Sequence, residues 1–188
     1  MFRCKWCFGC CYFVFISGFW RSGGLGKIDM ENKFILDVCC GGRMMWFNKY
    51  HPNVLYLDIR SRARGFCKQR PNFCIKPDQI QDYTNLKLKD KSFKLVVWDP
   101  PHCIRKKSEL GVITKKYGSL GPNEWQNNLK KGFLECWRVL EKQGILIFKW
   151  NEQEKKLKDI LALFPVDPLF GHTTGSRSKT HWLCFMKL

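Results

Sequence analysis

The chain has 188 residues, enough for one domain with a single hydrophobic core but too few for two ordinary domains. Hydrophobic residues make up 45% of the sequence and charged residues 26%, a composition that excludes a disordered or low-complexity protein. The formal net charge of +17 favours a polyanionic partner, foremost nucleic acid, because neutralising phosphates releases counterions. The alternative is a lysine-rich surface that only keeps the protein soluble.

Residues 1–29 are expected to be an N-terminal extension outside the fold, and residues 30–188 to form the domain. The extension contains an apolar run over 7–20, which is shorter than the about 20 residues that span a membrane, so no membrane association is expected. A CxxCxxC pattern in the same segment lacks a second Cys or His pair at usable spacing, so no metal is expected either. Without these 29 residues the net charge is still +14, so the basic character belongs to the domain.

From residue 33 onward, short apolar runs alternate with longer amphipathic stretches, a pattern typical of a repeating βα domain. The runs predict strands over 34–38, 54–58, 93–98, 144–150 and 181–186. Apolar residues three and four apart predict a helix over 123–141. A second helix is expected after Trp150, with Asn151 and Glu154 forming a capping box and Pro165 ending it. The expected fold is Rossmann-like α/β, with a mostly parallel sheet and an antiparallel C-terminal strand.

The eleven cysteines do not resemble a disulfide scaffold. Those of the domain stand singly or adjacent among apolar residues, which indicates reduced core thiols of an intracellular protein and therefore a cytoplasmic location. They are Cys39, Cys40, Cys67, Cys74, Cys103, Cys136 and Cys184.

Polar residues and glycines follow the predicted strands at the sheet edge where ligands bind in such folds. Gly41 and Gly42 come after the first strand, where the lack of a Cβ lets a ligand approach the backbone; a plain tight turn is the alternative. Asp58 lies 21 residues after Asp37, at the end of the next strand. A carboxylate there can accept both hydroxyl hydrogens of a ribose, whereas the alternative is an exposed loop acid. Together these features predict a nucleoside-cofactor site.

The turn Asp99-Pro100-Pro101-His102 follows the third predicted strand. Its two prolines fix the backbone and remove two donors, which leaves the Asp99 side chain and the Pro100 carbonyl as acceptors. An exocyclic amine that donates to both acceptors would aim its lone pair at a methyl donor. His102 could stack on the target or accept a proton. A rigid turn with a capping Asp is the alternative.

Residues 35–42 resemble motif I of the class I methyltransferases that use S-adenosylmethionine (SAM), and Asp58 resembles their ribose-binding acid. Asp82 stands where that family often places an acid or amide near the adenine amino group. Residues 99–102 resemble the motif of amino-group methyltransferases that act on adenine, cytosine or glutamine. The arrangement also resembles small methyltransferase-like proteins common in phages and Gram-positive bacteria, and the resemblance covers about residues 33–188.

The resemblance implies an enzyme that transfers a methyl group from SAM to an exocyclic amine, foremost N6 of adenine in DNA or RNA. It implies a cofactor-binding set of Asp37, Cys39, Gly41, Asp58 and Asp82, and a catalytic set of Asp99, Pro100, Pro101 and His102. The alternatives are a methyltransferase for a protein amide or a small molecule, and a non-catalytic protein of this fold that binds nucleic acid.

Three further expectations concern loops. Cys39 and Arg43 replace the first and last glycines of the usual turn, so this turn should be bulkier near the methionine moiety of SAM. The basic segment 103–122 is expected to close over the substrate. Residues 171–179 should form either a second phosphate-contacting edge or a surface hairpin turn.

Overall fold

The computed structural model describes residues 30–105, 111–175 and 178–188, so the predicted extension over 1–29 lies outside the described residues. The described chain forms one seven-stranded sheet with three helices. In chain order the elements are β1 (Ile35–Asp37), β2 (Val54–Asp58), β3 (Gln79–Ile80), β4 (Phe93–Trp98), α1 (Val112–Tyr117), α2 (Trp125–Val139), β5 (Leu140–Asn151), α3 (Leu157–Leu161), β6 (Phe170–Thr173) and β7 (Thr180–Met186).

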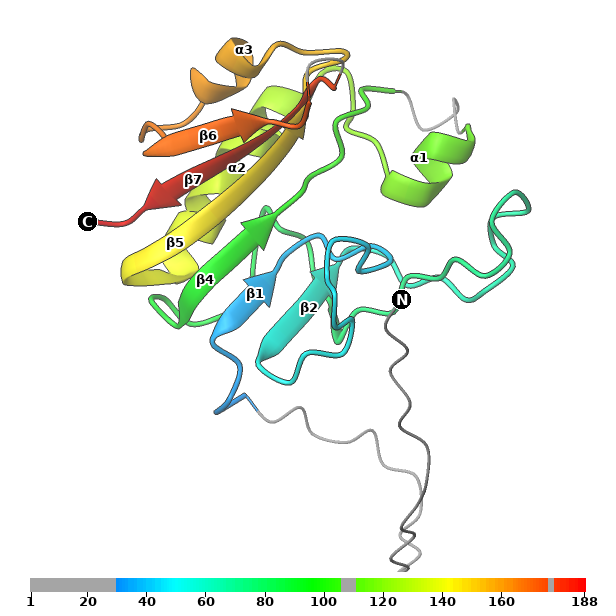
Figure 1. Cartoon of the computed structure of the whole chain (residues 1–188), viewed down its shortest axis with the longest axis horizontal. Helices are drawn as coiled ribbons and strands as arrows, with labels where there is room; N and C mark the ends of the chain where they lie inside the picture. The colour runs from blue at the N-terminus through cyan, green and yellow to red at the C-terminus, as the bar shows by residue number, and fades with distance from the viewer. Residues whose placement is uncertain (1–29, 106–110, 176–177) are drawn as a thin grey trace, which may run out of the picture.

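The strand order is β3-β2-β1-β4-β5-β7-β6. Strands β1 to β5 pair in parallel, and β7 runs antiparallel between β5 and β6. The order reverses at β1, since β2 lies on one side of it and β4 on the other, and such a switch point opens a crevice beyond the strand ends. The arrowheads of β1, β2 and β4 point toward the side of the molecule where α1 lies (Figure 1). The expected Rossmann-like fold is confirmed.

Helix α2 packs across one face of the sheet and supplies much of the main core. Its residues Leu129, Phe133 and Cys136 are fully buried, and the Phe133 ring stacks on Phe164 at 4.3 Å between ring centroids. The predicted helix over 123–141 is confirmed with shorter ends. β5 begins at Leu140, earlier than the predicted strand at 144, because Leu140 already pairs with Phe93 of β4.

The predicted capping box of the last helix is wrong. Asn151 is the final residue of β5 and pairs with Thr180 of β7, so it cannot cap a helix. Glu154 instead turns toward the segment after β4, where its carboxylate accepts from the Ile104 backbone N–H at 2.8 Å. α3 begins only at Leu157, whose backbone N–H donates to the Glu152 carboxylate.

The opposite face of β1 and β2 is covered by the turns between them. Trp46 from these turns meets Tyr56 of β2 edge to face, with ring centroids 5.5 Å apart, and both belong to a smaller second cluster. The seven described cysteines are all free; Cys40, Cys67, Cys136 and Cys184 are buried, and Cys39, Cys74 and Cys103 are partly exposed.

Two loops contain more regular structure than predicted. The segment 103–122 contains α1, although 106–110 lie outside the described residues. For 171–179, the structure shows the hairpin alternative: β6 and β7 pair antiparallel, and the Thr174 backbone N–H donates to the Thr180 carbonyl. Ser176 and Arg177 in this hairpin are outside the described residues.

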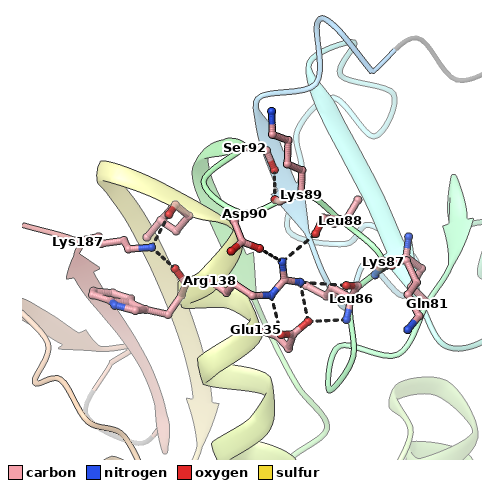
Figure 2. Close-up of polar contacts among 12 residues, drawn as sticks. Gln81, Leu86, Lys87, Leu88, Lys89, Asp90, Ser92, Glu135, Arg138 and Lys187 are labelled. Atoms are coloured by element: carbon pink, nitrogen blue, oxygen red, sulfur yellow. Dashed lines mark hydrogen bonds and ion pairs between the residues drawn. The ribbon is translucent and has the colours of Figure 1, made fainter.

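Arg138 near the end of α2 attaches the loop between β3 and β4 to the helix (Figure 2). Its guanidinium donates to both carboxylate oxygens of Glu135 at 2.8 Å and to the carbonyls of Leu86 and Leu88 at 3.0 and 2.9 Å, and it pairs with Asp90. The Glu135 carboxylate also accepts from the Leu86 backbone N–H. Because this loop continues from the segment that carries Asp82, the network helps to hold one wall of the site described next.

Candidate functional site

A cavity of about 880 Å³ opens beyond the carboxyl ends of β1, β2 and β4, a volume suited to a cofactor. Eight of the nine predicted site residues line it: Cys39, Gly41, Asp58, Asp82, Asp99, Pro100, Pro101 and His102. The structure therefore brings together the glycine turn, the strand-end acid and the Asp-Pro-Pro-His turn. The ninth residue, Asp37, does not line the cavity.

Asp37 lies fully buried beneath the glycine turn. Its carboxylate accepts from the Cys39 backbone N–H at 3.2 Å and from the Trp46 indole N–H at 2.7 Å. Burial raises the pKa of Asp37 to about 7, although these two hydrogen bonds favour the ionised form. Asp37 thus holds the turn in place and has no direct access to the cavity.

The glycine turn contributes Cys39, Gly41 and Gly42 to the cavity wall. Gly41 adopts a φ of +47° with open space beside it, and its backbone N–H donates to Asp58 at 3.0 Å. A Cβ on Gly42 would lie 2.3 Å from the Phe73 ring, so a larger residue there would require that ring to move. Arg43 does not line the cavity, because its guanidinium lies 3.8 Å over the Tyr56 ring. Of the two residues expected to add bulk near the cofactor, Cys39 therefore lines the cavity and Arg43 does not.

Asp58 ends β2 and is 4% exposed. Besides the Gly41 N–H, it accepts from the backbone N–H of Arg60 at 2.9 Å. The Arg60 guanidinium also donates to both carboxylate oxygens, with Nε 3.1 Å from Oδ1 and Nη2 3.3 Å from Oδ2. From the sequence alone, Arg60 was assigned no role in the site beyond its positive charge. Its position two residues after a strand-end acid is the signal that could have predicted this ion pair.

Asp99 at the end of β4 pairs with Lys149 of β5, whose Nζ lies 2.6 Å from Oδ2. The same ammonium lies 5.5 Å from the centre of the Trp182 ring. Sequence reasoning did not select Lys149. The available signal was that Lys149 is the one charged residue within the predicted strand 144–150.

Pro100 and Pro101, whose backbone is rigid, separate Asp99 from His102. Burial lowers the pKa of His102 below its ordinary value, and the nearby Asp99 only partly opposes this shift, so the imidazole is neutral at pH 7. A neutral ring is suited both to stacking and to accepting a proton. Pro101 faces α1, since a Cβ on Gly118 would lie 3.1 Å from Pro101 Cγ.

Asp82 lies at the outer end of the cavity and is exposed. One of its carboxylate oxygens accepts from the backbone N–H and the hydroxyl of Thr84, both at 2.9 Å. The other oxygen makes no hydrogen bond to any described residue. Asp82 therefore keeps acceptor capacity on the wall where an adenine amino group was expected.

Basic and aromatic side chains line the wall opposite the strand ends. Arg62, Lys115 and Lys116 lie there together with Phe73 and Tyr117. The Lys116 ammonium lies 4.6 Å from the centre of the Tyr117 ring and 5.2 Å from that of Phe73. Residues 114–120 of the basic segment 103–122 thus face the cavity.

Comparison with solved structures identifies a shared fold. PH0226 protein from Pyrococcus horikoshii superimposes with a TM-score of 0.53 at 15% identity, over 82% of this chain and 81% of that chain. The chain therefore shares the fold of this protein. SAM-dependent methyltransferases from Thermotoga maritima (TM-score 0.49, 14% identity, 82% of each chain) and Corynebacterium glutamicum (0.46, 16%, 82% and 79%) are also similar. No family model and no curated protein matches the sequence.

Two other kinds of feature are absent from the described ranges. Residues 30–105, 111–175 and 178–188 hold no group of three or more His, Cys, Asp or Glu side chains arranged to bind a metal ion. Within the same ranges, no helix has the length and apolar character needed to cross a membrane.

Proposed function

We propose that the chain is a SAM-dependent methyltransferase that methylates an exocyclic amine, foremost N6 of adenine in nucleic acid. One observation carries this proposal: a single cavity places Asp58 and the glycine turn beside the Asp-Pro-Pro-His turn. Asp58 and the glycine turn have the chemistry to hold a nucleoside, and the Asp-Pro-Pro-His turn offers acceptors to an amine.

The cofactor half of the cavity offers polar groups of the kind that bind SAM. The open space beside Gly41 admits a ligand close to the backbone, and Asp58 supplies the carboxylate that a ribose diol requires. Asp82 offers an acceptor to the adenine amino group. SAM supplies a methyl group on a positively charged sulfur, which is electrophilic enough for direct transfer to nitrogen.

The target half positions the amine. The two N–H groups of the amine donate hydrogen bonds to the Asp99 carboxylate and the Pro100 carbonyl. These bonds draw the nitrogen lone pair out of conjugation and toward the methyl group. A bond forms between nitrogen and the methyl carbon as the carbon–sulfur bond breaks, and that electron pair stays on sulfur. The nitrogen then releases one proton, which Asp99 can pass to solvent. His102 supplies a neutral flat face for the target ring.

A nucleic-acid target is supported by the wall of the cavity that carries α1. Arg62, Lys115 and Lys116 can bind phosphates, while Phe73 and Tyr117 offer rings on which an extruded base can stack. A protein amide shares the amine chemistry but gives no role to this basic wall.

Cofactor titration and labelling test the proposal. Calorimetry with SAM is expected to show one binding site, and labelled SAM is expected to mark single-stranded DNA or RNA in preference to a protein extract. Absence of SAM binding would sink the proposal. Binding without transfer to any of these acceptors would indicate a non-catalytic protein of this fold, and labelling of protein alone would favour the amide alternative.

The Asp99→Ala variant separates target chemistry from cofactor binding. Transfer is expected to fall at least about 100-fold, while the dissociation constant for SAM stays within about 2-fold. Asp159→Ala on the exposed side of α3 is the matched control and should change neither quantity. Equal loss of binding and transfer in Asp99→Ala would mean that Asp99 belongs to the cofactor half.

A further inference from the structure

We infer that the Arg60 side chain occupies the ribose position of the cofactor site, and that cofactor binding displaces it and thereby releases α1. This inference rests on the proposed function, because it assumes that the cavity binds SAM. It concerns how the same site is opened and in which order its two ligands bind.

The acceptor capacity of Asp58 is already filled. An ionised carboxylate offers about four lone-pair positions. Oδ2 accepts from the Gly41 backbone N–H and from Arg60 Nη2, and Oδ1 accepts from the Arg60 backbone N–H and Nε. Four donors therefore occupy four positions, and a ribose can bind Asp58 only after some donors leave.

The donors that leave must be those of the Arg60 side chain. The two backbone N–H groups are fixed by the glycine turn and by the chain after β2, whereas the guanidinium is held at the end of a flexible side chain. Nε and Nη2 of the guanidinium each donate to one carboxylate oxygen, as the two hydroxyl groups of a ribose would. The guanidinium fork and the diol are thus alternative partners of the same two oxygens.

The third nitrogen of the guanidinium connects this pair to α1. Arg60 Nη1 lies 3.4 Å from both the Lys115 and the Lys116 carbonyl oxygens, at the C-terminal end of that helix. These carbonyls belong to the last turn, where a helix leaves its acceptors unsatisfied. Gly118, which follows them with a φ of +84°, lies close to both Arg60 Nη1 and Pro101.

Displacement of Arg60 therefore changes the wall that faces the catalytic turn. When a diol takes the Asp58 oxygens, the guanidinium moves away and the α1 carbonyls lose a donor. α1 has six residues and one buried side chain, Thr114, so few other contacts hold it. The cofactor is then expected to bind first and to loosen α1, which opens the target half of the cavity to the methyl acceptor.

Removal of the Arg60 side chain tests the competition. Arg60→Met is expected to bind S-adenosylhomocysteine about 10-fold more tightly than the wild type, because the ligand no longer displaces a charge-assisted pair. Arg60→Lys, which retains one charged donor but not the fork, is expected to lie between them. Arg64→Met is the matched control, since Arg64 is exposed on the same segment and does not line the cavity. Calorimetry measures all four proteins.

Hydrogen exchange of the wild type supplies an independent readout if a variant folds poorly. Amides of 111–118 are expected to exchange faster when S-adenosylhomocysteine is added. Weaker or unchanged binding by Arg60→Met, or slower exchange in 111–118 on ligand addition, overturns the inference while the proposed function stands. If neither the wild type nor Arg60→Met binds the ligand, the proposed function fails and this inference fails with it.

Discussion

Asp37 should make the stability of the protein fall as the pH rises from about 4 to about 7. Burial raises the pKa of this carboxyl from 3.8 to about 7 in the folded chain. Between these two pH values the folded state holds a proton that the unfolded chain has released, so a higher pH favours unfolding. The difference of about three pKa units corresponds to roughly 4 kcal/mol, at 1.36 kcal/mol per unit.

Asp37→Asn removes this titration and leaves every other group in place. The free energy of unfolding of the variant minus that of the wild type should therefore become more positive by about 4 kcal/mol between pH 4 and pH 8. Any hydrogen bond that Asn cannot make to Cys39 or Trp46 adds only a constant offset. Urea titrations at fixed ionic strength measure the difference, with Asp159→Asn as the exposed control. A difference that does not vary with pH would refute the assigned cause.

Two further substitutions test contacts that hold the site. Arg138→Met should lower the free energy of unfolding by about 2 kcal/mol, since the Glu135 carboxylate and two loop carbonyls lose their donor. Urea titration measures this change in the free energy of unfolding. A change no larger than that of the control Arg64→Met would contradict the role of Arg138. Lys149→Met should lower kcat for methyl transfer about 10- to 100-fold with little change in SAM affinity, because Asp99 loses the ammonium that orients it. Lys149→Arg should restore part of kcat in the same labelling assay, and an unchanged kcat in Lys149→Met would refute the assignment.

The sequence predicts the central part of the fold well, because buried parallel strands are continuous apolar runs. It does not predict β3 or β6, which lie at the two edges of the sheet and expose Ile80 and Phe170 by 63% and 68%. The two-residue β3 exists through its pairing with β2 and not through any local pattern. α1 is also absent from the prediction, since its six residues form no apolar stripe.

The candidate site divides in the same way. Gly41, Asp58 and Asp99 could be selected because each lies at the end of a strand or within four residues after it, and parallel strands bring such positions to one edge. The contact of Lys149 with Asp99 could not be predicted, because it depends on the register that pairs Trp98 of β4 with Phe148 of β5. The sequence places Arg43 in the turn, but it does not predict the direction of its side chain, which depends on the contact with the Tyr56 ring.

The order of the strands also bears on how the chain folds and opens. β4, β5, β6 and β7 follow one another within residues 93–186, whereas β1 pairs with β4 across more than 50 residues of chain. Closing such a long loop costs entropy before any contact forms, so the β1–β2 half is expected to fold last and to open first. This is the half that carries Gly41 and Asp58. A ligand held there would stabilise the least stable part of the sheet, so the level of cofactor would determine how long the chain resists proteolysis.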